Sequence, residues 1–238
     1  MDLIPAIARW LADPAHWQGP AGIPARLGEH VLLSAAALAI AALIGLTLGV
    51  RVGHTGRGAT LAVNLANLGR ALPTFAVMAI VVPITAAIDS QLGFKVYPAV
   101  IGLVVLAIPP ILVNAYAGVS GVEREIVEAG RASGMTGGQV LRRIELPLAA
   151  PVIVGGVRSA ASQIIATATL AAVFGGPGLG RFAVEGYAQL DYPMLWVGII
   201  LVGALFAVVE LGLAVVQRGL TSPVVRTGYV LASADHRA

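Results

Sequence analysis

The chain contains no cysteine, few charged residues and few aromatic residues. Without cysteine it can form neither a disulfide nor a thiolate-ligated metal site. Only 11% of the residues are charged, whereas soluble domains carry about a quarter; 58% are hydrophobic, and the mean hydropathy is +0.88. This composition predicts an integral membrane protein. A chain of 238 residues leaves room for one membrane domain without an attached soluble enzyme.

Further absences narrow the class of function. No glycine-rich loop ending in lysine and a hydroxyl residue occurs, so this chain is not expected to be an ATP-hydrolysing enzyme. The glycine-rich run FGGPGLG at 174–180 lacks that ending and is expected to form a turn. The basic residues are scattered and the net charge is only +3, so no nucleic-acid partner is expected. The histidines share no ligand spacing, and no metal site or other cofactor is expected in this chain: His16, His30, His54 and His236.

Five apolar stretches are long enough to cross a membrane as helices, which takes roughly twenty residues. They lie at 31–50, 59–88, 97–117, 148–174 and 194–216. The second stretch is too long for one straight crossing, so its helix either kinks near Pro73 or extends beyond the membrane at its start. The sequence therefore predicts an all-α integral membrane protein with about five transmembrane helices.

Two terminal segments flank the membrane domain expected at 29–217. Residues 1–28 are expected outside, and apolar residues there share one helical face: Leu3, Ile4, Ile7, Trp10 and Leu11. This pattern fits an amphipathic helix lying in the interface, although a partly ordered tail is an alternative. The start of the segment lacks the basic residues and continuous apolar run of a cleavable signal peptide, so none is expected. Residues 218–238 are expected to form a polar cytoplasmic tail.

A charged island at 120–147 interrupts the apolar sequence. Two patterns in it, Ser120 with Glu123 and Thr136 with Gln139, predict capping boxes that begin two short helices. Gly134 can adopt the left-handed conformation that ends the first helix, and Pro147 is expected to limit the second. We predict a helix, a tight turn and a second helix outside the bilayer.

The distribution of Arg and Lys predicts the orientation. Placing the island inside puts nine basic residues in cytoplasmic segments: Arg51, Arg57, Arg124, Arg131, Arg142, Arg143, Arg218, Arg226 and Arg237. Four then lie outside: Arg9, Arg26, Lys95 and Arg181. An excess of basic residues on the cytoplasmic side is the usual arrangement. The amino terminus is therefore expected outside and the carboxyl terminus in the cytoplasm.

The island also carries a recognisable pattern. Glu128-Ala129-Gly130 is followed after three residues by Gly134 and after nine more by Ile144-Glu145-Leu146-Pro147. This pattern resembles the cytoplasmic signature E-A-A, three residues, G, nine residues, I-x-L-P of the permease subunits of ATP-driven (ABC) importers. The departure is Gly130, which replaces the third small residue, Ala. The resemblance implies a type I importer permease fold, similar to that of methionine importers, with a cytoplasmic coupling-helix loop.

In that family the loop sits in a groove of a separate ATPase subunit. The resemblance assigns this docking role to Glu128, Ala129, Gly130, Gly134, Met135 and Thr136. It also implies that Ile144, Leu146 and Pro147 lead into the fourth span. ATP and magnesium would then be cofactors of the ATPase and not of this chain.

Other segments resemble the permeases of glycine betaine, choline, carnitine and proline (osmoprotectant) importers. They are NLGRALPTFAV, IPPILVNAYAGV, GMTGGQVLRRIELPLAAPVIVGGVRSA and ATATLAAVFGGPGLG. The implied function is the translocation path for a quaternary ammonium compatible solute delivered by an external binding protein. The implied partners are an ATPase dimer and a second permease, identical or homologous, in a bacterial cytoplasmic (inner) membrane. Alternatives are a permease for another amino acid such as methionine, an ion-coupled secondary transporter, or a scaffold that only recruits an ATPase.

Charged residues fall within or near predicted spans at Arg70, Arg158 and Glu210. A charge in hydrocarbon costs about 2.5–3.5 kcal/mol on insertion scales, so such groups should pair, reach the interface or face water. Arg70 or Arg158 could line or gate a path. The alternative is a structural ion pair between helices, such as Arg158 with Glu210.

Overall fold

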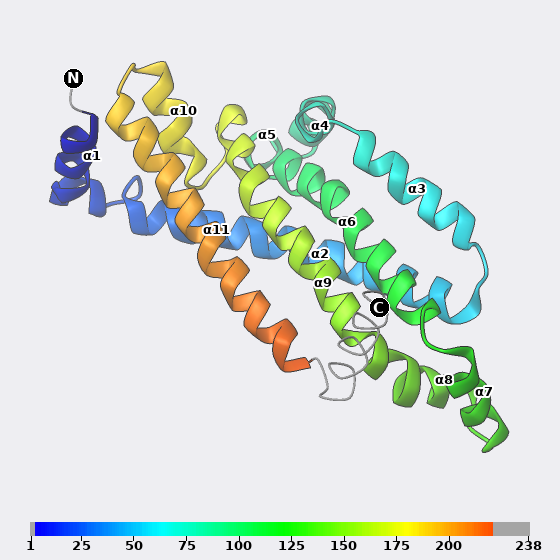
Figure 1. Ribbon diagram of the computed structural model, residues 1–238. Coiled ribbons are helices and arrows are strands. Elements are labelled where there is room, and N and C mark those ends of the chain that lie inside the picture. Colours follow the sequence, from blue (N-terminus) through cyan, green and yellow to red (C-terminus); the bar gives the residue numbers. More distant parts are fainter. Residues whose placement is uncertain (1–2, 221–238) are drawn as a thin grey trace, which may run out of the picture.

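The computed structural model describes residues 3–220, and within that range every regular element is a helix (Figure 1). The polar tail expected at 218–238, with Arg226 and Arg237, therefore lies almost entirely outside the described residues. The α-helices are α1 (Leu3–Ala12), α2 (Ile23–Thr55), α3 (Ala59–Ala71), α4 (Thr74–Ile88), α5 (Leu92–Lys95), α6 (Tyr97–Ser120), α7 (Arg124–Ala132), α8 (Gly137–Val140), α9 (Leu146–Thr167), α10 (Gly180–Ala188) and α11 (Tyr192–Leu220).

Four helical segments are long and apolar enough to cross a membrane, and α3 with α4 forms a fifth if the bent pair is counted as one span. The four segments are Ile23–Thr55, Leu92–Ser120, Gly137–Phe174 and Tyr192–Gly219. The expectation of an all-α protein with about five spans is confirmed on that count. α1 and α10 lie at one end of the bundle, and α7 and α8 lie at the opposite end (Figure 1).

The second span is broken where the sequence places Pro73. α3 and α4 meet at 89°, and both Leu72 and Pro73 adopt extended backbone between them. A proline disfavours helical backbone at the residue before it, which explains why α3 stops at Ala71. The kink expected near Pro73 is confirmed. By contrast, Pro109 and Pro110 lie inside α6, which continues through both.

The core is built on close contact between α2 and α6. Small residues on α2 recur every fourth position and form one stripe along its buried side: Ala37, Ala41, Gly45, Gly49 and Gly53. Residues of α6 fill the space opposite, so that a Cβ on Gly49 would lie 2.5 Å from the carbonyl oxygen of Leu112. Membrane helices pack in this way because small side chains let two backbones approach.

The amino-terminal segment packs against the last two helices, α10 and α11. The ring of Trp10 in α1 stacks on His16 at 3.6 Å between centroids and meets the edge of Phe182 in α10 at 5.7 Å. Trp17 donates a hydrogen bond to the carbonyl of Leu11 at 2.8 Å. α2 begins at Ile23, so the expected boundary between residues 28 and 29 falls inside that helix.

Candidate functional site

The loop between α6 and α9 ends its first helix with a closed backbone motif. Gly134 has φ +83°, the left-handed conformation that glycine adopts without strain, as the sequence predicts. Its N–H donates to the carbonyl of Arg131 at 2.9 Å, and the N–H of Met135 donates to that of Gly130 at 3.2 Å. This pair of bonds is the Schellman motif, which satisfies the last carbonyls of α7. The turn between α7 and α8 is therefore fixed by its own hydrogen bonds.

The second predicted capping box is confirmed and the first is wrong. The Thr136 N–H donates to the Gln139 side chain at 2.8 Å, and the Gln139 N–H donates to the Thr136 hydroxyl at 3.4 Å. Ser120 instead ends α6 and donates its hydroxyl to the Tyr116 carbonyl at 2.8 Å. α6 continues one turn further than expected, so α7 begins after Glu123 without a side-chain cap.

Gly130 lies buried beneath this turn. A Cβ on Gly130 would lie 2.5 Å from Cδ1 of Ile144 and 3.3 Å from Sδ of Met135. Ile144 therefore occupies the volume that an alanine side chain would take at this position. The shorter residue at the third position of the E-A-A pattern thus leaves room for the tip of Ile144.

The outer side of the loop is exposed and carries both charged and small residues. Arg124 and Glu128 pair at 2.7 Å on this side, with side chains 90% and 58% exposed. Of the residues assigned to docking, five are exposed: Glu128, Ala129, Gly134, Thr136 and Pro147. Met135, Ile144 and Leu146 are half-buried, and Gly130 is buried. The structure therefore divides the predicted set into an accessible surface and its support.

The second short helix continues through Pro147, which the sequence expects to limit it, and leads into the fourth span as the resemblance implies. α8 passes through a π-helical turn, Leu141–Glu145, directly into α9, and Pro147 lies in the first turn of α9. The Leu146 N–H reaches back five residues to the carbonyl of Leu141. The helix continues through this wider π-helical turn to Pro147, because a proline is tolerated in the first turn of a helix. The second part of the loop and the fourth span therefore form one continuous helical rod from Gly137 to Phe174.

A side-chain contact that sequence reasoning missed ties this rod to the first span. Glu145, 4% exposed, accepts a hydrogen bond from Nδ1 of His54 at 2.5 Å. His54 lies in the last turn of α2, 91 residues earlier in the chain. Glu145 occupies the variable position of the I-x-L-P pattern, so the pattern itself gives no sign of the contact.

Two of the predicted intramembrane charges form one cluster. Arg158 of α9 donates from Nε at 2.8 Å and Nη2 at 2.5 Å to the same carboxylate oxygen of Glu210 in α11. Ser162 donates to the other oxygen at 2.6 Å, and Gln217 accepts from Nη1 of Arg158 at 2.9 Å. The ion-pair alternative is therefore what the structure shows. Arg70 does not join the cluster; it lies exposed in the last turn of α3.

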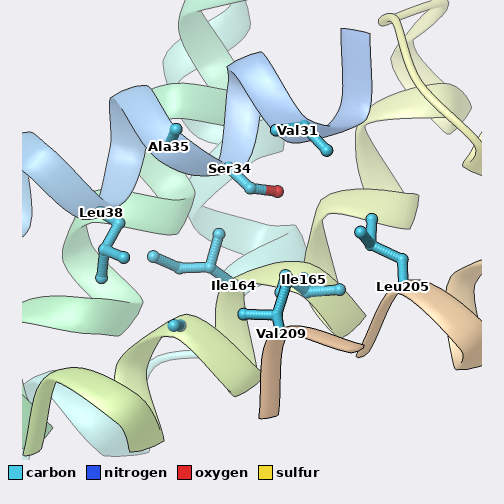
Figure 2. A pocket seen from close by; sticks show the side chains of 9 residues that line it. Val31, Ser34, Ala35, Leu38, Ile164, Ile165, Leu205 and Val209 are labelled. Atoms are coloured by element: carbon cyan, nitrogen blue, oxygen red, sulfur yellow. The ribbon is translucent and has the colours of Figure 1, made fainter. Parts of the chain in front are cut away.

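An apolar cavity of about 140 Å³ lies on another side of α9 (Figure 2). The buried Ser34 hydroxyl points into it and has no hydrogen-bond partner within residues 3–220. The lining comes from α2, α9 and α11: Val31, Ser34, Ala35, Leu38, Ala161, Ile164, Ile165, Leu205 and Val209.

The glycine-rich run after the fourth span forms a turn, as the sequence predicts. Gly175 and Gly178 have φ +71° and +109°, and the Gly178 N–H donates to the Glu29 carboxylate at 2.9 Å. His30 beside it is buried and contacts the carbonyl of Ile165 at 3.0 Å. The turn thus joins the end of the fourth span to the start of α2.

Comparison with known proteins places this arrangement in a family. Residues 30–222 match the model of the binding-protein-dependent transport system inner membrane component. The chain belongs to this family. It is therefore a multi-pass permease component of a membrane transport system and not an enzyme.

Curated relatives cover most of the permease. It is 32% identical to the glycine betaine/carnitine/choline transport system permease protein OpuCB of Bacillus subtilis, over 82% of this chain and 87% of that one. It is 35% identical to the choline transport system permease protein OpuBB of the same organism, over 81% and 86%. It is 34% identical to the osmoprotectant import permease protein OsmW of Salmonella typhimurium, over 76% and 84%.

Solved structures share the fold of the permease. A chain of the MetNI methionine ABC transporter in an inward-facing conformation superposes with a TM-score of 0.74 at 21% identity, covering 89% of this chain and all of that one. At this identity the likeness shows the fold alone. The predicted type I, methionine-importer-like fold is confirmed.

Proposed function

We propose that this permease forms the membrane path of an ATP-driven importer for a quaternary ammonium compatible solute. The class includes glycine betaine, choline, carnitine and proline-like zwitterions. Support comes from relatives at 32–35% identity whose names specify glycine betaine, carnitine and choline. The methionine alternative has only the shared fold in its favour.

The observation that carries the ATP-driven mechanism is the loop 124–147. Its turn is closed by the Schellman motif at Gly134 and by the Thr136 capping box. It continues into the fourth span as a rod, and Glu145 fastens it to α2. A loop of this kind can pass a push from a docked ATPase to two spans at once, whereas a flexible linker would absorb it. The exposed side of the loop is accordingly the docking surface for an ATPase subunit.

The remaining parts of the assembly follow from this function. Two permeases, identical or homologous, would enclose the path, and two ATPase subunits holding ATP and magnesium would close and open on their loops. An external binding protein would deliver the solute. The loop end of the bundle would face the cytoplasm and the α1–α10 end the outside, in agreement with nine basic residues against four.

Uptake by the reconstituted complex tests the proposal. Vesicles with the permease, its ATPase inside and the binding protein outside should accumulate labelled glycine betaine, choline or carnitine only with internal ATP. Methionine should not compete. Uptake driven by an ion gradient without ATP, or uptake of methionine alone, would contradict the proposal.

A further inference from the structure

A polar groove runs between α9 and α11. It has a volume of about 460 Å³ and is open at the surface of the protein. We define it by six lining residues: Arg158, Ser159, Ser162, Gln163, Phe206 and Glu210. At a rise of about 1.5 Å per residue, Arg158 lies about 18 Å along the helix from Leu146, and Glu210 lies about 27 Å from Tyr192. The polar groove therefore lies within both helices, in the half of α11 that ends at Leu220.

The charged residues of the polar groove are paired with each other but remain partly exposed. Arg158 and Glu210 neutralise each other, yet their side chains remain 31% and 29% exposed. Ser159 and Gln163 are exposed beside them, and the amide of Gln163 donates to the Ser159 hydroxyl at 3.3 Å. Hydrocarbon offers no hydrogen bonds to such groups, so this side cannot face lipid.

The neighbouring surfaces have the opposite character. The other side of α9 buries Ala160 and Ile164 against the core. Exposed apolar side chains cover another side of α11, where Val208 and Leu211 are 69% and 67% exposed. α11 thus has an apolar side suited to lipid and a polar side suited to water. Water at this depth requires an enclosed path.

We propose that the polar groove is a wall of the water-filled translocation path, and that Phe206 meets the cationic head of the passing solute. This inference rests on the proposed function. Phe206 is 38% exposed and stands one helical turn before Glu210. An aromatic face beside a carboxylate attracts a quaternary ammonium group. The neutral, paired charges and the small hydroxyl residues keep this attraction weak, which allows the solute to leave again.

The absence of cysteine makes the polar groove directly testable. Single variants S159C and Q163C introduce one thiol each at the polar groove, and V208C and L211C introduce one each on the apolar side of α11 as matched controls. The probe is trimethylammonium-ethyl methanethiosulfonate, which forms a mixed disulfide with a thiolate and releases methanesulfinate. The reagent carries the head group proposed for the solute and reacts only where water reaches the thiol.

In the complete complex in lipid vesicles, we expect both groove thiols to react at least tenfold faster than both control thiols. Excess glycine betaine under transport conditions should slow the reaction at the groove and leave the controls unchanged. Equal rates at all four positions would place the polar groove against lipid. If the groove thiols do not react with the reagent but form a disulfide between two permease copies, the polar groove is a contact surface between permeases that excludes water. Either result overturns the inference.

The role of Phe206 has its own measurement. F206L removes the ring and should raise the KM for choline uptake three- to tenfold, whereas F206Y keeps the ring and should restore it. An unchanged KM in F206L overturns the contact with the cationic head. Uptake by the unmodified chain separates this inference from the proposed function. If the groove thiols react but no quaternary ammonium solute is taken up, the proposed solute class is refuted. If such a solute is taken up but the groove thiols do not react, the proposal that the polar groove lines the path is refuted.

Discussion

Ile144 occupies the space that a side chain on Gly130 would need. An ideal Cβ on Gly130 would lie 2.5 Å from Cδ1 of Ile144, directly beneath the turn of the docking loop. The two residues belong to different parts of the E-A-A and I-x-L-P pattern, and here their sizes are matched to each other. Overpacking a tight site of this kind costs about 1–3 kcal/mol.

The first prediction tests that match. G130A should weaken binding of the ATPase subunit, because the Ile144 side chain beneath the turn, or the turn itself, must shift to admit the methyl group. The double variant G130A/I144V, which lacks Cδ1, should restore binding. The measurement is the amount of ATPase retained on the purified permease. No rescue by I144V would show that the two positions act independently.

The second prediction concerns Glu145 and His54. E145A leaves the imidazole of His54 without its acceptor and should destabilise the loop by about 1–3 kcal/mol. E145Q keeps an oxygen acceptor and serves as the matched control. We expect E145A to lower the Tm of the complex and to raise the ATP hydrolysed per solute imported, with E145Q close to the unmodified protein. Equal behaviour of the two variants would argue against the contact.

The third prediction concerns the stripe of small residues on α2. Replacing glycine by alanine within a helix normally stabilises it by up to about 1 kcal/mol. G49A should do the opposite, because its methyl group meets the Leu112 carbonyl and Ala115. G212A on α11, where a Cβ meets nothing within 4 Å, is the control. Thermal unfolding in detergent should show a lower Tm for G49A and an equal or higher Tm for G212A.

The fourth prediction concerns the ion pair between α9 and α11. Among residues 3–220, R158M leaves Glu210 with the hydrogen bond from Ser162, and E210M leaves Arg158 with the hydrogen bond to Gln217. Each single variant should lower the Tm, because it removes the link between α9 and α11 and leaves the other charge without its ionic partner. The double variant R158M/E210M should recover much of the loss because neither charge stays alone. A double variant as unstable as the singles would show that the pair is not the main link.

The sequence predicts the features that depend on local chemistry. Pro73 breaks the second span, Gly134 closes the first short helix, and Thr136 with Gln139 begins the second, because each effect acts within a few residues. Ser120 does not begin a helix because α6 runs as far as Ser120, which is its last residue. The sequence contains the stripe from Ala37 to Gly53 as small residues at every fourth position, but this stripe was not predicted as a packing surface.

Contacts between segments far apart in the chain could not be predicted from local sequence patterns. The Glu145–His54 bond joins positions 91 residues apart, and no pattern in either segment points to the other. Arg158 and Glu210 were foreseen as one possible pair because unpaired charges in a span are costly. That the pair also borders the polar groove depends on the relative rotation of α9 and α11, which the sequence does not determine.

The central claim is that the loop 124–147 docks an ATPase subunit. The most direct test is affinity purification of the permease from its native membrane with three residues in turn at position 134. Gly134 is exposed at φ +83° with nothing near its Cβ position, so a substitution strains the backbone without causing a clash. Asn tolerates this conformation, whereas the β-branched Val does not.

We expect the ATPase to co-purify at one subunit per permease with the native Gly134, to remain with G134N, and to be lost with G134V while the permease stays folded. Absence of an ATPase from the native complex, or its full retention with G134V, would contradict the account.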